Sequence, residues 1–230
     1  MKRLTGIMLL LVSGCGSQEN AGDPFTSEKA PFQEETIKTT VAGQEAALPD
    51  ETIALTDEQI YELLERRTGQ WKVEGTGSSP DAASFEAMGI SVARWKEKGR
   101  SIEMVGINSR QGKTTYFLGT VTFDSGLGVF VQRTVMNEMT IVSHRRWNPN
   151  TRTLVITRIA PPLPSGVKFD FQAQLIDAQT TELQFKVFEN DTEVFSESST
   201  GEKIGPIDDA RFEALLSSFQ KQQESMIRDR

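Results

Sequence analysis

The chain offers few side chains for acid–base, nucleophilic or metal chemistry, because its 230 residues include one histidine, His144, and one cysteine, Cys15. Zinc sites draw on several His or Cys ligands, so we expect no metal centre and no cofactor. A Ser-His-Asp triad would have to use His144 as its general base. The segment Asp124-Ser125-Gly126 superficially fits the nucleophile of such a triad, but it is typical of a hairpin turn. A hydrolase that uses His144 is therefore only an alternative interpretation.

A basic run, His144-Arg145-Arg146-Trp147, is the second chemically notable segment. Arg133, Arg152 and Arg158 lie close to it in the sequence. Such a cluster is suited to an anionic ligand or headgroup. Because side chains alternate along a strand, however, the neighbouring arginines should point to opposite faces of a sheet.

Cys15 ends a segment that is organised like an export signal. Lys2 and Arg3 precede an apolar run at residues 7–12 that is too short to span a bilayer as a helix. The sequence Val12-Ser13-Gly14-Cys15 resembles the lipobox of bacterial lipoproteins. That resemblance implies a signal peptide at residues 1–14, cleavage before Cys15, and acylation of Cys15. Membrane lipid would then be the partner of the acylated cysteine.

The resemblance also bears on location. In bacterial lipoproteins an aspartate after the cysteine marks retention in the inner membrane, and this chain has Gly16 there. We therefore expect a lipid-anchored envelope protein, on the periplasmic face of the outer membrane rather than at the inner membrane.

Residues 15–55 are expected to form a disordered acidic tether. Residues 16–55 contain eight acidic residues and two lysines, and no helical or strand period is sustained in them. The chain as a whole carries −7, residues 1–15 carry +2 and residues 16–55 carry −6, which leaves −3 for residues 56–230. The part expected to fold thus lacks the concentrated positive charge of a nucleic-acid-binding domain.

Hydrophobic periodicity predicts a mainly β domain at residues 56–204. A capping box at Thr56-Asp57-Glu58-Gln59 opens a short helix with an apolar stripe of Ile60, Leu63 and Leu64. About eight to ten strands should follow, and hairpin connections without crossover helices predict an antiparallel up-and-down β-barrel. The ten candidate runs are residues 71–77, 90–98, 101–108, 114–123, 128–135, 139–147, 153–159, 167–176, 182–189 and 192–198.

The connections carry three further expectations. Asn190-Asp191 should form a two-residue hairpin that places Val187 opposite Val194. The Gly/Ser segment at residues 75–80 should be a mobile loop at the barrel rim. The proline-rich segment at residues 160–166 cannot form the interior of a paired strand and should be an ordered loop or lid.

A C-terminal amphipathic helix is expected within residues 205–230. Phe212, Leu215, Leu216 and Phe219 follow the spacing of a single helical face, which must be buried against something. Packing on the chain's own barrel is the simpler interpretation. In the alternative, the chain is a structural accessory subunit of an envelope complex that docks through the Phe212 and Phe219 face.

Gly69-Gln70-Trp71, at the junction of the first helix and the first strand, resembles the Gly-X-Trp motif of lipocalin-like (calycin-type) barrels. It is closer still to uncharacterised bacterial domains of this type that open with a helix. In lipocalins the tryptophan closes one barrel end and an arginine near the last strand packs on it. Lys203 is the basic residue near that place here.

The expected interior leads to the functional prediction. Alternation directs large aromatic side chains inward and leaves a small apolar pocket near one end. The candidate ligand-binding residues are Trp71, Phe117, Phe169, Phe171 and Phe185. We therefore expect a non-enzymatic envelope module that binds a small apolar or amphipathic ligand or an envelope partner, with an exported hydrolase as the contrary class.

The substitution Cys15→Ala tests the anchor. It should abolish metabolic labelling with a radioactive fatty acid and leave a precursor of full length on a denaturing gel, because cleavage before the cysteine requires its modification. Normal processing of the variant would mean that an ordinary signal peptidase acts on the chain.

Overall fold

The computed structural model describes residues 54–80, 82–137 and 139–228. The predicted signal peptide, Cys15 and the tether up to residue 53 lie outside the described residues. Among the helices of the described part, none is both long enough and apolar enough to cross a bilayer.

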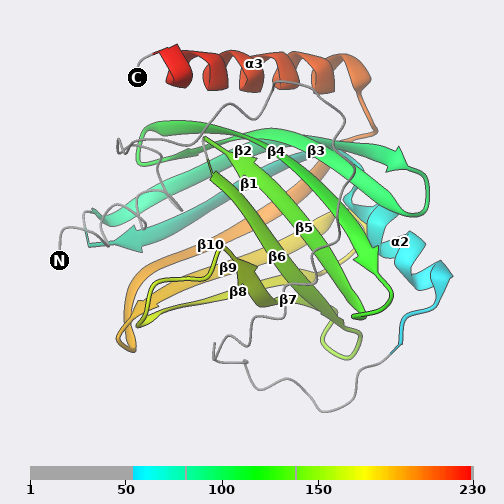
Figure 1. Cartoon of the computed structure of the whole chain (residues 1–230), viewed down its shortest axis with the longest axis horizontal. Coiled ribbons are helices and arrows are strands. Elements are labelled where there is room, and N and C mark those ends of the chain that lie inside the picture. The colour runs from blue at the N-terminus through cyan, green and yellow to red at the C-terminus, as the bar shows by residue number, and fades with distance from the viewer. Residues whose placement is uncertain (1–53, 81, 138, 229–230) are drawn as a thin grey trace. The chain divides into compact units, whose positions relative to one another are not determined.

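Ten antiparallel strands form a closed barrel in which each strand pairs with the next along the chain and β1 pairs with β10 (Figure 1). This confirms the predicted fold class. The strands are β1 (Gly69–Ser79), β2 (Ala82–Glu97), β3 (Ser101–Arg110), β4 (Lys113–Asp124), β5 (Val129–Met136), β6 (Met139–Asn148), β7 (Thr153–Ala160), β8 (Val167–Leu175), β9 (Thr180–Glu189) and β10 (Thr192–Gly205).

Several details of the strands differ from the sequence predictions. β2 begins at Ala82 and not at residue 90, and β10 continues to Gly205 and does not end at residue 198. The segment at residues 75–79 is part of β1 and not a rim loop, because Gly75 and Gly77 fit where a side chain would collide with Ser199 and the Phe85 ring. The Asn190-Asp191 hairpin forms as predicted, with positive φ at both residues. A register shift in β10, however, pairs Val187 with Phe195 instead of Val194. The bulge thereby buries the larger side chain.

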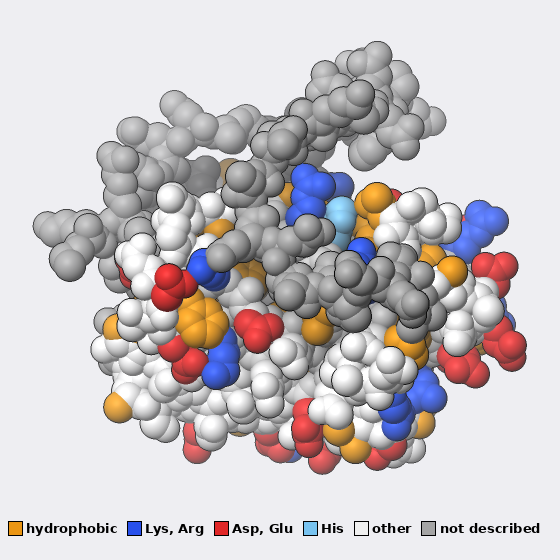
Figure 2. All heavy atoms as spheres, turned by 90° about the horizontal axis from the view of Figure 1, so that it is seen from below, with side chains coloured by type: hydrophobic (Ala, Val, Ile, Leu, Met, Phe, Trp, Pro, Cys, Tyr) orange, Lys and Arg blue, Asp and Glu red, His pale blue; other side chains and the backbone are white. Residues whose placement is uncertain are grey.

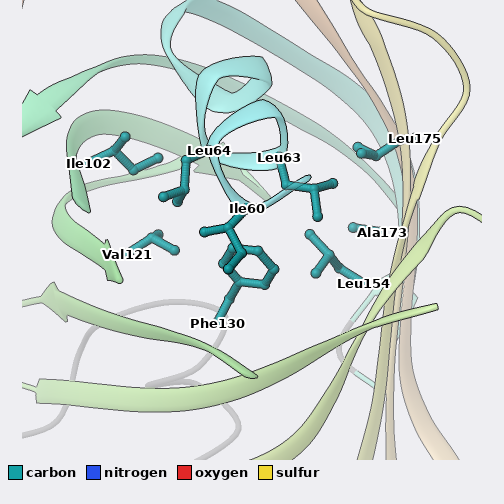
Figure 3. Close-up of a cluster of buried hydrophobic side chains, with 9 residues drawn as sticks. All are labelled: Ile60, Leu63, Leu64, Ile102, Val121, Phe130, Leu154, Ala173 and Leu175. Carbon is teal, nitrogen blue, oxygen red and sulfur yellow. The ribbon is translucent and has the colours of Figure 1, made fainter. Parts of the chain in front are cut away.

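Helix α2 (Asp57–Arg67) closes one end of the barrel. Its N-terminus has the predicted capping box, in which the Thr56 hydroxyl accepts from the Gln59 amide. Ile60, Leu63 and Leu64 are buried against the inner side chains of β3–β5, β7 and β8 (Figure 3). These partners are Ile102, Val121, Phe130, Leu154, Ala173 and Leu175.

Helix α3 (Asp209–Arg228) lies across the outside of β2, β3 and β4 (Figure 1). Phe212 and Phe219 are buried there against Val92 and Val105. Docking of a partner through this face is therefore wrong, because the barrel already covers it. Figure 2 views the molecule from the side opposite this helix.

The first turn of α3 is fixed to the barrel by Arg94 of β2. Its guanidinium lies 3.8 Å from the centroid of the Phe212 ring and forms salt bridges with Glu103, Asp209 and Glu213. Burial disfavours the charged form, but the hydrogen bonds to these carboxylates outweigh burial and raise the pKa of Arg94. Arg94 is thus a fully compensated cation.

The seam between β7 and β8 is the least paired part of the barrel. These strands pair only over residues 153–155 and 172–174, close to α2. Beyond this point β7 pairs only with β6, and β8 pairs only with β9. The proline-rich loop that joins them lies at the end of the barrel opposite α2, beside the Asn190 turn, where the Asn190 amide donates to the Gly166 carbonyl.

The substitution Phe212→Ala tests the packing of α3. Truncation of a fully buried phenylalanine should lower the free energy of unfolding by about 3–5 kcal/mol, which urea denaturation measures. Lys221→Ala, at an exposed position of the same helix, is the control and should change it by less than about 0.5 kcal/mol. Equal effects of the two substitutions would show that α3 does not pack on the barrel in solution.

Candidate functional site

An internal cavity of about 180 Å³ lies between α2 and the barrel wall, and we call it the inner cavity. Most of its wall is apolar, because alternate residues of each strand point inward. Trp71 and Val73 of β1, Ala93 of β2 and Met104 of β3 line one side. Leu154, Ala173 and Leu183 line the other. The cavity reaches the surface at the exposed β8–β9 turn, where it is lined by Asp177 and Ala178.

Three arginines, Arg66, Arg67 and Arg145, bring positive charge into the wall of this mostly apolar cavity, and the contacts of Arg67 and Arg145 define the candidate site. Arg67 ends α2 and donates from Nη2 to Gln132 Oε1 at 2.9 Å, while its Nη1 is buried without a hydrogen-bond partner. Arg145 points inward from β6, donates from Nε to Ser143 Oγ at 3.3 Å, and lies 4.6 Å from the centroid of the Phe171 ring. Neither forms a salt bridge with a carboxylate of the described residues.

Burial lowers the pKa of both guanidinium groups. The pKa of Arg67 falls to about 10 by burial alone. The pKa of Arg145 falls to about 9, through burial and then through repulsion from Arg67. Both side chains still carry a full charge at pH 7. Both residues are half-buried. Cations that are partly removed from water without a counter-charge are costly to a folded protein, and such groups are typical of anion-binding sites.

The surrounding polar groups hold Arg67 in place. The Trp71 indole N–H donates to the Arg67 carbonyl at 3.1 Å and ties the end of α2 to the first strand. Gln132, which accepts from Arg67, donates in turn from Nε2 to Thr134 Oγ1 at 3.1 Å. The tryptophan of the Gly-X-Trp motif therefore has two roles, because it lines the cavity and positions a cation in it.

The five residues predicted to bind ligand occupy different parts of the barrel. Trp71 lines the inner cavity, and Phe171 packs against Arg145. Phe169 and Phe185 stack edge to face at 5.5 Å, and Phe185 continues towards Phe195 at 5.6 Å, nearer the end opposite α2. The Phe117 ring covers Gly106 on the inner face of β3. None of these placements tests ligand binding, which stays a prediction.

The basic run alternates between the two faces of β6 as predicted. Arg145 lines the inner cavity, whereas His144 pairs with Val131 and Arg158 on the outer side. Burial, and then repulsion from Arg158, lowers the pKa of His144. Figure 2 shows the histidine among basic side chains on the outer surface. His144 therefore cannot serve as a catalytic base inside the cavity.

Three further sequence predictions concern metal binding, the proline-rich loop and the end of α2. Among the described residues, no group of three or more His, Cys, Asp and Glu side chains is arranged to hold a metal ion. The proline-rich loop does not cover the inner cavity, because it lies at the opposite end of the barrel. Arg67 was missed by sequence reasoning. Its one signal is its position at the end of a capped helix, immediately before the Gly-X-Trp motif.

Comparisons with known proteins give structural likenesses only. No protein-family model matches the chain, and no curated protein matches it. Three solved structures are similar over 63% of this chain. Rv2717c from M. tuberculosis has a TM-score of 0.48 and 13% identity, with 96% of that chain covered. The S-type phycobiliprotein lyase CPES from Guillardia theta has a TM-score of 0.33 and 11% identity, with 92% covered.

The third similar structure is a DUF3598-family protein of unknown function from Nostoc punctiforme. It has a TM-score of 0.23 and 10% identity, with 98% of that chain covered. At these identities, the chemistry of the present chain has to be argued from its own residues.

The substitution Arg145→Met tests whether this charge is uncompensated. The variant should gain about 1 kcal/mol in free energy of unfolding at pH 7 without ligand, because an apolar side chain of similar length replaces an unpaired buried cation. Urea denaturation measures the change. Arg94→Met is the matched control, since it removes a compensated arginine and should lose about 1–2 kcal/mol. A loss of stability in Arg145→Met as large as in the control would contradict the assignment.

Proposed function

We propose that the protein is a non-enzymatic binding module for a small molecule with an apolar body and one anionic group, such as a carboxylate. The observation that carries the proposal is that two guanidinium groups without a salt bridge, those of Arg67 and Arg145, lie in the wall of a mostly apolar cavity. The anionic group would supply the counter-charge that the described residues do not.

The dimensions limit the ligand. A dry cavity of about 150 Å³ accommodates a benzene molecule. The inner cavity, at about 180 Å³, therefore suits a single aromatic ring or a short alkyl chain. Guanidinium groups recognise carboxylates through charge-assisted and often bidentate hydrogen bonds, which fixes the orientation of the bound molecule. The apolar body would lie against Val73, Met104 and Leu183.

Binding is favoured over catalysis by the chemistry of the cavity wall. A nucleophile needs an adjacent base to act at neutral pH. Ser91 and Thr181 line the inner cavity, but the chain's one histidine lies on the outer side of β6. A hydrolase built on His144 is therefore not supported by this cavity.

A location at the cell envelope is part of the proposal. It rests on the segment Val12-Ser13-Gly14-Cys15 and its resemblance to the lipobox. An acylated Cys15 would hold the binding barrel at the periplasmic face of the outer membrane, where small amphipathic molecules pass.

Two matched pairs of ligands test the proposal on the full-length chain. Benzoate and hexanoate carry the charge, whereas benzyl alcohol and hexan-1-ol have nearly the same size without it. The anionic members should raise the melting temperature, because binding to the folded state at 100 times the dissociation constant stabilises it by about 2.7 kcal/mol. The alcohols should bind at least about tenfold more weakly, since they forgo a charged hydrogen bond. Equal affinities within each pair, or no binding at all, would refute the proposal.

Two variants test separately the role of the Arg145 charge and the role of the volume of the inner cavity. Arg145→Met should remove the preference for the anion while leaving the weaker alcohol binding unchanged. Ala173→Phe should fill the inner cavity and remove most of the rise in melting temperature for all four ligands. Anion binding should stay constant from pH 6 to 8 and decline above about pH 9, as the lowered pKa of Arg145 is passed and its charge is lost. An unchanged anion affinity in Arg145→Met would show that Arg145 does not bind the anion.

A further inference from the structure

A second cavity, also of about 180 Å³, lies between α2 and the β6–β7 turn, and we call it the outer cavity. Gln59, Glu62 and Arg66 of the helix line it, together with Trp147 of β6 and Arg152 of the β6–β7 turn. Leu63, Arg66 and Leu175 belong to the walls of both cavities. The two spaces therefore adjoin, with these shared side chains between them.

The outer cavity has its own pair of cations. Arg152 adopts a left-handed backbone conformation, with φ of 53°, and donates from Nη1 to the Ile176 carbonyl at 2.9 Å, which holds its guanidinium at the cavity edge. Arg66 stands on the last turn of α2, directly before Arg67. Successive helical residues point about 100° apart, so Arg66 borders both cavities while Arg67 points inward. Glu62 forms no salt bridge with either arginine of this pair.

The polar and aromatic attachments of α2 lie on one side of the helix, and the side chains that the two cavities share lie elsewhere on it. On the side of β1 and β2 the helix is fixed, because Tyr61 stacks on Trp95 at 5.4 Å and the Trp95 indole donates to Glu65 at 2.7 Å. On the opposite side, Leu63 has space in both directions. Figure 3 shows Leu63 between Leu154 and Leu175. Leu63 and Leu175 therefore form part of the wall that the two cavities share.

We infer that the outer cavity is a second subsite for the same class of ligand, a small aromatic or alkyl carboxylate, and that the ligand is captured there before it passes to the inner cavity. Arg66 and Arg152 attract the carboxylate, and the Trp147 ring provides an apolar surface for its body. The inference rests on the proposed function, because it assigns the order in which two pairs of arginines meet one ligand.

An outer subsite on the path of binding has a kinetic signature. Cations that line the approach raise the association rate and make it sensitive to salt. Removal of a group that acts only on the path slows association and dissociation equally, so the dissociation constant is unchanged. Removal of a group that holds the bound ligand speeds dissociation instead.

Stopped-flow quenching of tryptophan fluorescence by 4-nitrobenzoate, on the full-length chain at low salt, measures both rates. Arg152→Gln, which changes only the outer cavity, should lower the association and dissociation rates about fivefold, with a dissociation constant within twofold of the original and a weaker salt dependence. Arg66→Gln, which changes both cavities, should lower the association rate by a similar factor and also weaken the dissociation constant. Arg158→Gln removes an exposed arginine on the outer face of β7 and should change neither rate. The rates for 4-nitrobenzyl alcohol should not change in any variant.

A second measurement isolates the outer subsite at equilibrium. Ala173→Phe, which fills the inner cavity, should retain 4-nitrobenzoate binding at least tenfold weaker than in the original chain, and Arg152→Gln should abolish that remainder. Complete loss of 4-nitrobenzoate binding in Ala173→Phe alone would overturn the inference. An unchanged association rate in Arg66→Gln and Arg152→Gln would also overturn it, whether or not the dissociation constant weakens. Failure of the unmodified chain to bind any anionic probe would instead refute the proposed function, and the inference with it.

Discussion

Helix α2 reaches into one end of the barrel with Ile60, Leu63 and Leu64, and the depth of that insertion decides what the rest of the interior is. A ten-stranded barrel is too wide for its wall residues alone to fill beside small side chains such as Ala93, Ala173 and Gly201. The helix supplies the missing core on one side and leaves the inner cavity on the other. Because Trp71 fixes the helix end, the same insertion also carries Arg67 inside. Core packing and site geometry are thus set by a single contact surface.

The two groups of arginines show how differently a protein treats the same side chain. Arg94 is surrounded by three carboxylates and holds α3 to the barrel, so its charge stabilises the fold. Arg67 and Arg145 have only neutral partners and repel each other, so their charges weaken it. Unpaired charges of this kind lower the stability of the fold. They lie at the cavity wall, where the proposed anionic ligand would offset this cost.

Much of this architecture could be predicted from sequence, since alternation is a local property. Polar and apolar residues alternate clearly in β8 and β9, and Thr56 to Gln59 encode the helix start. The predictions failed where contacts between residues far apart in the sequence determine the structure. The sequence around Gly75 and Gly77 predicts a loop, but Ser199 and the Phe85 ring fill the space beside these glycines and the segment is a strand. A bulge in β10 pairs Phe195, and not Val194, with Val187.

The candidate site was harder to predict than the fold. Alternation showed that Arg145 and Arg146 point to opposite faces but could not show which one points inward. Nothing local brings Arg67, near the start of the domain, to the same cavity as Arg145 of β6. The proximity of Arg67 and Arg145 depends on where α2 packs in the barrel, and side chains from many strands determine that position.

Because β7 and β8 pair over only three residues each, the remaining edges of these two strands face each other without forming backbone hydrogen bonds between them. Edges of this kind are templates on which a second chain can add a strand, and they make a barrel prone to self-association. The loop that joins the two strands places Pro161, Pro162 and Pro164 at the open end, where residues without an N–H group interrupt any added ladder. Lys168 and Asp170 put opposite charges on the outward face of β8. The proline-rich segment thus offers few backbone donors to a neighbouring chain at the end of the seam.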